Sequence, residues 1–381
     1  MTLFQKNKME SNKPKNDNIT PFDGNMMQRC LQLARQAEGY TAPNPLVGCV
    51  ILREGNIVGE GYHPEAGQPH AEVFALRQAG NLAEGATLYV NLEPCNHYGR
   101  TPPCSEAIIA AKITKVFVGM VDPDRRVAGG GIDRLRQGGI EVIVGVEEAK
   151  CRQLNEAFIH RSLYQRPWGV LKYAMTLDGK IAATSGHSAW VTGPRSRHRV
   201  HQERAIADAV IVGGNTVRRD NPHLTTHGVS PRNPLRVVMS RTLDLPLEAN
   251  LWQVRENPTL VLTQTGANSQ QREYLQNKGV EVVEFPELTP DTAMQHLGDR
   301  GFSRILWECG GVLAAQAIAQ GAVQKIMAFV SPKIIGGSAA PSPVGDLGFT
   351  KMTDALLLEQ IKITQIDADL LIEGYLQQRK V

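Results

Sequence analysis

The sequence predicts an α/β protein built from two consecutive domains. Its 381 residues suit two domains of ordinary size. From Asp23 onward, segments with the apolar spacing of helices alternate with segments of strand character, as is typical of layered α/β sheets. A polar, proline-marked stretch, YQRPW at residues 164–168, separates two such alternations. We therefore expect a disordered lead-in at residues 1–22, a first domain at 23–164 and a second at 165–381.

The elements of the first half follow from periodicity and turn residues. A hairpin is expected within residues 46–62, because Glu54-Gly55-Asn56 is a turn sequence between two apolar runs. Further strands are expected over residues 86–92, 115–121 and 140–146. Helices are expected where apolar residues recur three and four apart, over residues 24–39, 70–80, 104–113, 130–139 and about 147–163.

The second half repeats the alternation without resembling the first. Helices are expected over residues 195–207 and 312–321. Strands are expected over residues 168–177, 208–214, 235–240, 259–264, 280–285, 304–311 and 324–335. Because the two halves differ, we expect them to carry different chemistry.

Composition excludes several classes of protein. Hydrophobic residues make up 42% and charged residues 21%, and the net charge is only +3, which does not indicate a nucleic-acid partner. No apolar run approaches the ~18–20 residues of a membrane span, and the polar N-terminus lacks the apolar region of a secretory signal. The six cysteines are expected to be thiols or metal ligands, and the chain to be cytoplasmic.

Two short motifs in the first half predict a catalytic zinc site. PHAE, residues 69–72, supplies His70 and Glu72 at the start of a predicted helix, and NLEPCNHYGRTPPC supplies Cys95 and Cys104. One His and two Cys ligands that leave a fourth position open for water are typical of catalytic zinc. An H-x-E motif followed by Pro-Cys is typical of zinc deaminases, in which the Glu carries protons and is not a ligand.

Other interpretations of these residues remain open. The group could be a closed structural zinc site or simply buried thiols. His63 and His97 are rival ligands, although we expect them to line a substrate pocket. The remaining cysteines lie in apolar segments and are expected in the core; they are Cys30, Cys49, Cys151 and Cys309.

The second half lacks the G-x-G-x-x-G fingerprint of a dinucleotide site. Its best phosphate candidate is WECGGVLAAQAI, in which a strand ends at Gly310-Gly311 and a helix begins at once. VGGNTVRRDNP is a second strand-to-turn junction of the same kind. In the first half, VAGGGIDRLRQGG is glycine-rich, but we interpret it as a turn before a helix.

Longer stretches of the first half resemble a known family. APNPLVGCVI, GYHPEAGQPHAE and EPCNHYGRTPPC are similar to the deaminase domain of the bifunctional riboflavin-biosynthesis deaminase/reductases. That family separates the two cysteines by an insertion, whereas other zinc deaminases place them close together. The resemblance implies a cytidine-deaminase-like three-layer domain that holds Zn2+ on His70, Cys95 and Cys104 and uses Glu72 as proton donor. Its substrate would be 2,5-diamino-6-(5-phosphoribosylamino)pyrimidin-4-one.

The second half resembles the reductase domain of the same family. The matching stretches are LKYAMTLDGKIA, SAWVTG, VGGNTVRRDNPHLT and ECGG. The resemblance implies a dihydrofolate-reductase-like fold that uses NADPH to reduce a ribosyl to a ribityl chain. The implied NADPH contacts are Ala174, Trp190, Thr216, Asp220, Gly310 and Gly311. The implied substrate contacts are Ser188, Arg204, Leu224, His227 and Glu308, with Lys172 near the reacting sugar.

Two positions depart from the family pattern. His227 stands where the family often has Arg, so phosphate binding there is expected to be weaker or dependent on pH. Ser240-Arg241 stands where the family tends to have Asp-Ser, and we hypothesise that Arg241 reaches the 2′-phosphate of NADPH.

The sequence therefore predicts a bifunctional enzyme of riboflavin biosynthesis, a hydrolase followed by an NADP-dependent oxidoreductase. Its expected partner is a phosphorylated pyrimidine, with no nucleic acid or membrane partner, and a homo-oligomer (dimer or tetramer) is expected. The enzymatic alternative is a nucleobase or tRNA deaminase with a non-catalytic C-terminal domain, which predicts a C-x2-C pair and a strongly basic face. A scaffold protein that retains a structural zinc is the non-enzymatic alternative.

Overall fold

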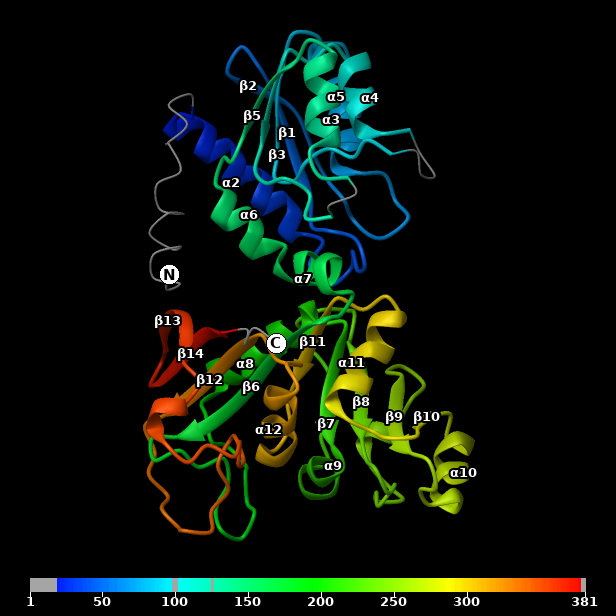
Figure 1. Ribbon diagram of the computed structural model, residues 1–381, viewed down its shortest axis with the longest axis vertical. Coiled ribbons are helices and arrows are strands. Elements are labelled where there is room, and N and C mark those ends of the chain that lie inside the picture. Colours follow the sequence, from blue (N-terminus) through cyan, green and yellow to red (C-terminus); the bar gives the residue numbers. More distant parts are fainter. Residues whose placement is uncertain (1–18, 98–101, 125–126, 378–381) are drawn as a thin grey trace. The chain divides into compact units, whose positions relative to one another are not determined.

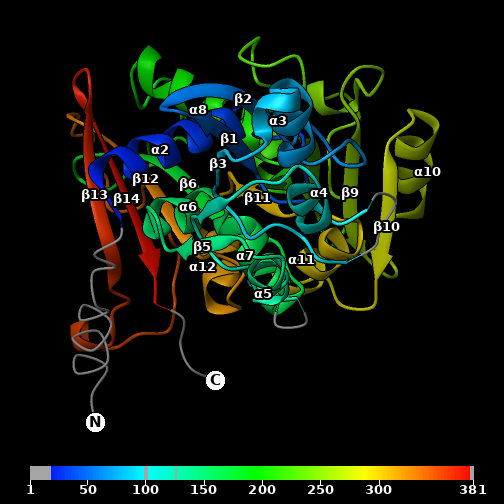
Figure 2. The same ribbon diagram turned by 90° about the horizontal axis from the view of Figure 1, so that it is seen from above.

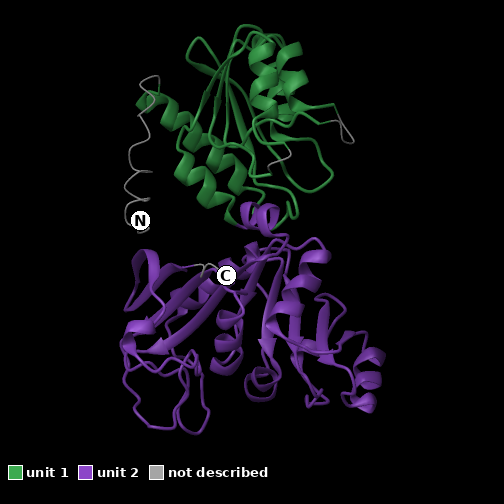
Figure 3. Ribbon diagram, in the orientation of Figure 1, with its two compact units in different colours: residues 1–156 green, residues 157–381 purple. Residues whose placement is uncertain are grey.

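The computed structural model describes residues 19–97, 102–124 and 127–377. The chain forms two compact units, residues 1–156 and 157–381 (Figure 3). Most of the predicted lead-in, up to residue 18, lies outside the described residues, and a helix already begins at Pro21. Among the described residues, no helix is both long enough and apolar enough to cross a membrane.

Unit 1 is built on a five-stranded sheet. Its strands are β1 (Gly48–Arg53), β2 (Asn56–Tyr62), β3 (Thr87–Val90), β4 (Lys115–Val118) and β5 (Glu141–Val144), and its helices are α2 (Pro21–Arg35), α3 (Ala71–Ala79), α4 (Cys104–Ala110), α5 (Gly130–Gln137) and α6 (Glu148–Leu154). The strand order is β2-β1-β3-β4-β5; β1 is antiparallel to β2 and β3, and β3, β4 and β5 are parallel. Helices α3, α4 and α5 cover one face and α2 and α6 the other, which makes three layers (Figure 1).

Glycines in the β1–β2 hairpin allow the helices to approach the sheet closely. A Cβ atom on Gly61 would lie 2.4 Å from the carbonyl oxygen of Ala71 in α3, and one on Gly48 would lie 2.0 Å from that of Cys30 in α2. Because Cβ atoms do not tolerate such distances, only glycine fits at these positions. The close contact at Gly61 fixes the N-terminus of α3, where His70 and Glu72 lie.

Unit 2 is built on a nine-stranded sheet. Its strands are β6 (Trp168–Thr176), β7 (Ala209–Gly213), β8 (Leu235–Met239), β9 (Thr259–Gln264), β10 (Glu281–Phe285), β11 (Arg304–Trp307), β12 (Lys325–Ser331), β13 (Leu358–Ile366) and β14 (Asp369–Leu376). Its helices are α7 (Glu156–Tyr164), α8 (Pro194–Ile206), α9 (Gly214–Asp220), α10 (Ser269–Asn277), α11 (Pro290–Asp299) and α12 (Gly311–Ala319). The strand order is β10-β9-β8-β7-β11-β6-β12-β14-β13, and Figure 2 shows β10 and the β13–β14 pair at its opposite edges.

The seven strands from β10 to β12 run parallel, whereas β14 is antiparallel to both of its neighbours. One hydrophobic core lies between the sheet and α8, α9 and α10, and a second lies between the opposite face and α11 and α12. The chain returns from β10 at the edge to place β11 between β7 and β6. Ligands of open α/β sheets bind at such a reversal, outside the carboxyl ends of the strands.

The structure confirms the α/β class and most predicted elements, with specific differences. The single helix predicted near 147–163 is wrong, because Asn155 separates α6 from α7. The Asn155 side chain accepts a hydrogen bond from Leu46 N (2.8 Å) and donates one to Leu46 O (3.0 Å). Among the described residues, three α-helices and two strands were not predicted: α9, α10, α11, β13 and β14. The VGGNTVRRDNP segment was interpreted as a strand-to-turn junction, but the strand is followed by α9, which begins at a glycine and spans 7 residues.

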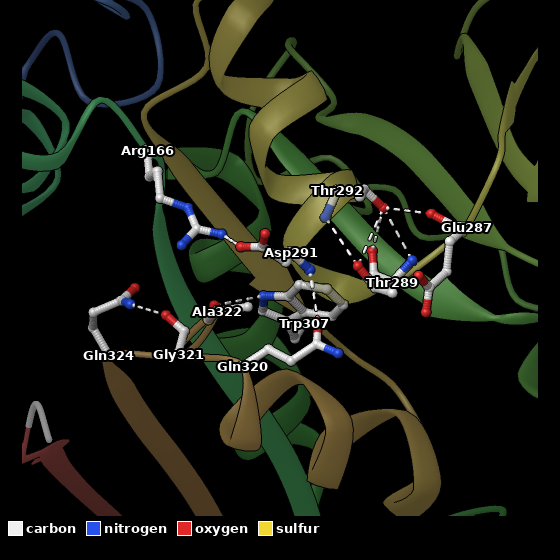
Figure 4. Close-up of polar contacts among 10 residues, drawn as sticks. All are labelled: Arg166, Glu287, Thr289, Asp291, Thr292, Trp307, Gln320, Gly321, Ala322 and Gln324. Atoms are coloured by element: carbon white, nitrogen blue, oxygen red, sulfur yellow. Dashed lines mark hydrogen bonds and ion pairs between the residues drawn. The ribbon is translucent and has the colours of Figure 1, made fainter. Parts of the chain in front are cut away.

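Polar contacts hold α11 against the hydrophobic core that it shares with α12 (Figure 4). Thr289 and Thr292 form a reciprocal capping box: Thr292 N donates to Thr289 Oγ1 (3.2 Å) and Thr289 N to Thr292 Oγ1 (3.0 Å). Asp291 N donates to Gln320 Oε1 (3.0 Å), and the Asp291 carboxylate pairs with Arg166. In this core, Trp307 is fully buried, and its Nε1 donates a hydrogen bond to the carbonyl oxygen of Ala322.

We expect Thr289→Ala to lower the free energy of unfolding of unit 2 by about 0.5–2 kcal/mol, because the first turn of α11 loses its side-chain acceptor. Urea unfolding followed by tryptophan fluorescence measures this effect selectively, because all four tryptophans lie in unit 2, at positions 168, 190, 252 and 307. The exposed Thr353 supplies the control variant Thr353→Ala. Equal midpoints for the two variants would contradict the capping role.

Candidate functional site

Three elements of unit 1 bring His70, Cys95 and Cys104 together. His70 is the N-cap of α3, and Cys104 is the first residue of α4, whereas Cys95 lies in the turn that follows β3. Their ligand atoms all lie within 4.8 Å of one another. His70 Nδ1 lies 3.2 Å from Cys104 Sγ and 3.5 Å from Cys95 Sγ. One imidazole and two thiols converging on a point form a donor set that suits zinc.

The ionisation of one thiol in this group favours metal binding. The hydrogen bond from Cys104 lowers the pKa of Cys95 to about 4, and the same hydrogen bond raises the pKa of the Cys104 thiol. The hydrogen bond to Cys95 also raises the pKa of His70. Cys95 is therefore a thiolate at neutral pH, which is the form that binds metals.

Glu72 lies in the first turn of α3, next to this group. Its side chain is buried, and its Oε2 atom has no hydrogen-bond partner among the described residues. Burial, followed by the negative charge of Cys95, raises the pKa of Glu72 to about 7. A buried carboxyl oxygen without a partner suits a group that receives a proton from a bound molecule, so these residues fit a catalytic zinc and its water.

The rival ligands lie outside the group that the described residues form. His63 is engaged through both ring nitrogens, with Asn44 Nδ2 3.1 Å from Nε2 and the carbonyl oxygen of Pro69 3.1 Å from Nδ1. His97 is exposed. The remaining four cysteines are buried, as expected of core residues; they are Cys30, Cys49, Cys151 and Cys309.

The turn between the two cysteines is tied at both ends. Ser105 N donates to Cys95 O (3.2 Å), Ser105 Oγ donates to Asn96 Oδ1 (2.9 Å), and Cys104 N donates to Cys95 Sγ (3.3 Å). These contacts return Cys104 to Cys95 across the long gap. The middle of this turn, residues 98–101, lies outside the described residues.

A second cluster lies in unit 2, at the carboxyl ends of its central strands. Glu308 follows β11, and its carboxylate accepts two hydrogen bonds from Arg204 of α8, from Nε at 2.6 Å and from Nη2 at 3.0 Å. Lys172 of β6 lies 3.7 Å from the same carboxylate. Burial opposes the ionisation of Glu308, but the charges of Arg204 and Lys172 lower its pKa to about 2. Burial lowers the pKa of Lys172.

Other predicted residues of the second half lie on neighbouring elements. Ala174 is two residues from Lys172 on β6 and therefore faces the same side of the sheet. Thr216 and Asp220 belong to α9, and Asp220 Oδ1 accepts a hydrogen bond from Ser188 Oγ (2.8 Å). Leu224 is buried in the loop that follows.

Trp190 is exposed to 67% and has a left-handed backbone, with φ +64°. Lys333 Nζ donates to its carbonyl oxygen at 2.6 Å, and the Arg197 guanidinium lies 4.3 Å from the centre of its ring. A bulky residue with positive φ is strained unless its surroundings hold it there. The two cations provide this support and leave the indole exposed.

The N-terminus of α12 suits an anionic cofactor. Its N-cap, Gly310, provides no side-chain hydrogen bond, and no side chain among the described residues accepts from the first backbone N–H groups of the helix. A Cβ atom on Gly311 would lie 2.6 Å from the carbonyl oxygen of Ser342, so only glycine fits there. Arg241 follows β8, two strands from β11, and its side chain is exposed. These residues fit NADPH at the strand ends.

The structure adds a residue that the sequence analysis did not single out. His201, on α8, stacks on His227, with ring centres 4.3 Å apart and planes 22° apart. The sequence could have indicated His201, because it lies three residues before Arg204 and residues three apart share a helix face. The contact with His227 joins α8 to the loop after α9 and is not visible in the sequence.

Comparisons with known proteins match both halves of the chain. The family model for the cytidine and deoxycytidylate deaminase zinc-binding region matches residues 21–120, and the model for the RibD C-terminal domain matches residues 167–372. The riboflavin biosynthesis protein RibD of Synechocystis is 60% identical over 354 residues, which cover 93% of this chain and 96% of the relative.

Two solved structures are also similar over nearly the whole chain. RibD of Acinetobacter baumannii is 38% identical with a TM-score of 0.83, and the match covers 93% of this chain and 99% of that one. A diaminohydroxyphosphoribosylaminopyrimidine deaminase/5-amino-6-(5-phosphoribosylamino)uracil reductase of Thermotoga maritima is 33% identical with a TM-score of 0.82 and the same coverage. A non-catalytic second domain is therefore not favoured.

The two domains use zinc and NADPH. The chain belongs to the RibD family of bifunctional riboflavin-biosynthesis enzymes, with a deaminase domain followed by a reductase domain.

Proposed function

We propose that unit 1 deaminates 2,5-diamino-6-(5-phosphoribosylamino)pyrimidin-4-one and that unit 2 reduces the ribosyl group of the product to a ribityl chain. The observation that carries this proposal is the unpartnered, buried Oε2 of Glu72 beside the convergent His70, Cys95 and Cys104. The name of the Thermotoga maritima neighbour supports the substrate. The domain limits 23–164 and 165–381, the homo-oligomer and the cytoplasmic location remain predictions.

In the deaminase domain, His70, Cys95 and Cys104 would hold zinc. Zinc, when bound, supplies the Lewis acidity that makes a water molecule nucleophilic near neutral pH. Glu72 takes a proton from the attacking water and delivers it to the departing ammonia. Burial raises the pKa of Glu72 to about 7, and a pKa near neutral suits proton transfer in both directions. His63, with its ring fixed by Asn44 and Pro69, presents a rigid wall beside this group.

In the reductase domain, NADPH supplies a hydride when bound. The backbone N–H groups at Gly310 and Gly311 would bind its phosphates, and the exposed indole of Trp190 would contact the cofactor. Arg204 and Lys172 face the substrate from α8 and β6, and Glu308 holds both cations in place. Ser188, Leu224 and His227 would complete the substrate contacts.

We expect Glu72→Gln to lower the rate of ammonia release by about 10²–10⁴-fold, because the amide cannot carry the proton. Zinc content, measured by atomic absorption, is expected to stay at the wild-type level. NADPH oxidation with the deaminated substrate in the same chain is the internal control and is expected to be unchanged. Ammonia release at the wild-type rate with zinc retained would exclude Glu72 as the proton carrier.

We expect the reductase domain to bind phosphorylated ligands more tightly as the pH falls from 8 to 6. Burial, followed by the nearby charges of His227 and Arg204, lowers the pKa of His201 to about 4, and burial and Arg204 lower the pKa of His227. His198, His223 and Glu308 are the other titratable neighbours. Both rings are therefore neutral in the free protein at pH 7, and a bound phosphate dianion favours their protonation, so affinity falls as pH rises.

Each proton taken up changes the dissociation constant by at most about tenfold per pH unit. Calorimetry with ribose 5-phosphate in buffers of different ionisation enthalpy counts these protons. His201→Gln is expected to reduce the uptake, whereas His296→Gln, which removes a ring on α11 against the opposite face of the sheet, leaves it unchanged. Equal proton uptake by wild type and His201→Gln would contradict the prediction.

We expect Arg241→Ala to weaken NADPH binding by about 10- to 100-fold and to leave NADH binding unchanged, because a charged hydrogen bond to the 2′-phosphate is lost. Arg255→Ala, at an exposed position in the segment before β9, is the matched control. Fluorescence titration with both cofactors measures the two affinities. An unchanged ratio of NADPH to NADH affinity would show that Arg241 does not read the 2′-phosphate.

A further inference from the structure

The side chain of Glu93 makes four hydrogen bonds to backbone N–H groups. Glu93 follows β3 and is buried. Its Oε1 accepts from Gly131 N (2.9 Å) and Ile132 N (3.2 Å), and its Oε2 accepts from Gly129 N (3.0 Å) and Asp122 N (3.1 Å). One carboxylate thus joins the end of β3 to the first turn of α5 and to the loop after β4.

Helix α5 has no cap of its own. Its N-cap, Gly129, has a left-handed backbone with φ +82° and no side chain that could accept a hydrogen bond. The Glu93 carboxylate supplies this acceptor from another strand and places a negative charge at the positive end of the helix dipole. The carboxylate contacts the backbone of the glycine run 129–131.

The same contact fixes the peptide that precedes Cys95. A Cβ atom on Gly131 would lie 1.9 Å from the carbonyl oxygen of Pro94, so this carbonyl packs directly against the helix backbone. Glu93 N also donates to Met120 O (2.9 Å). On the other side, Cys95 O accepts from Ser105 N (3.2 Å). Cys95 is therefore held between α5 and α4.

We propose that Glu93 is a positioning residue for Cys95: its carboxylate fixes the Pro94–Cys95 turn on the N-terminus of α5 and so directs the Cys95 thiolate to zinc. This inference rests on the proposed ligand set His70, Cys95 and Cys104. A glutamine at position 93 keeps the shape but turns one acceptor oxygen into an NH2 group that faces backbone N–H donors. The turn then relaxes, and the metal loses a preorganised ligand.

The test measures zinc affinity of the full-length chain by competition with a chelator. Glu93→Gln is expected to bind zinc about 10- to 100-fold more weakly and, with Co2+ in place of zinc, to shift the visible absorption bands. Reductase activity of the same chain is the internal control and is expected to be unchanged. Gly131→Ala keeps the carboxylate at position 93 but displaces the Pro94 carbonyl. It is expected to weaken zinc binding as well, and it decides the matter if Glu93→Gln does not fold.

Asp23→Asn is the matched control for a loss of stability alone. Asp23 is another buried carboxylate of unit 1; it caps α2 through Thr20 N (2.8 Å) and accepts from Tyr89 OH (2.6 Å). This variant is expected to lower the melting temperature and to leave the zinc affinity and the Co2+ spectrum within about twofold of wild type.

Cys95→Ser separates the two ways in which the proposal can fail. If Cys95→Ser keeps wild-type zinc affinity, the ligand set itself is wrong. If Cys95→Ser loses zinc but Glu93→Gln and Gly131→Ala keep wild-type affinity and Co2+ spectra, Glu93 only stabilises the fold and the positioning role is overturned. The positioning role is supported if Glu93→Gln and Gly131→Ala both bind zinc more weakly while Asp23→Asn binds it as wild type does.

Discussion

The convergence of two helix N-termini on the turn after β3 is the constraint on which the deaminase site depends. Each ligand lies at a point where the backbone changes direction: His70 immediately before α3, Cys104 at the start of α4 and Cys95 after a strand. The hydrogen bonds from Cys104 and His70 favour the thiolate form of Cys95. The close packing of β2 on α3 at Gly61 and the ties from Ser105 to the Cys95 turn hold these directions.

The reductase site depends on a different constraint: its charged side chains are already paired with one another in the absence of a ligand. Glu308 accepts two hydrogen bonds from Arg204 and lies beside Lys172, so three partly buried charges share one network across α8, β6 and the end of β11. An ion pair with so little exposure to solvent adds little to stability but fixes geometry, because each partner would be costly to leave alone. The substrate therefore meets cations whose positions are already set.

The sequence predicted local features and missed those that need distant partners. His70, Glu72, Cys95 and Cys104 could be predicted because the ligands occupy short motifs, and the β1–β2 hairpin because its turn is encoded by Glu54-Gly55-Asn56. Helix α9 was missed because it begins with glycine and spans two turns, and the β13–β14 pair because β13 is largely exposed and lacks a clear apolar period. The stacking of His201 on His227 and the capping of α5 by Glu93 join distant segments, so no local pattern encodes them.

Two glycine-rich helix starts in this chain show why such a motif alone does not identify a phosphate site. Both α5 and α12 begin at a glycine N-cap that supplies no side-chain acceptor. At α5, Glu93 from the neighbouring strand β3 occupies the N–H groups, so an anion from solution would have to displace a buried carboxylate. At α12, the carboxylate beside the turn, Glu308, is committed to Arg204 and leaves the helix end available. The position of one acidic side chain therefore decides whether a glycine turn holds the fold together or accepts an anionic cofactor.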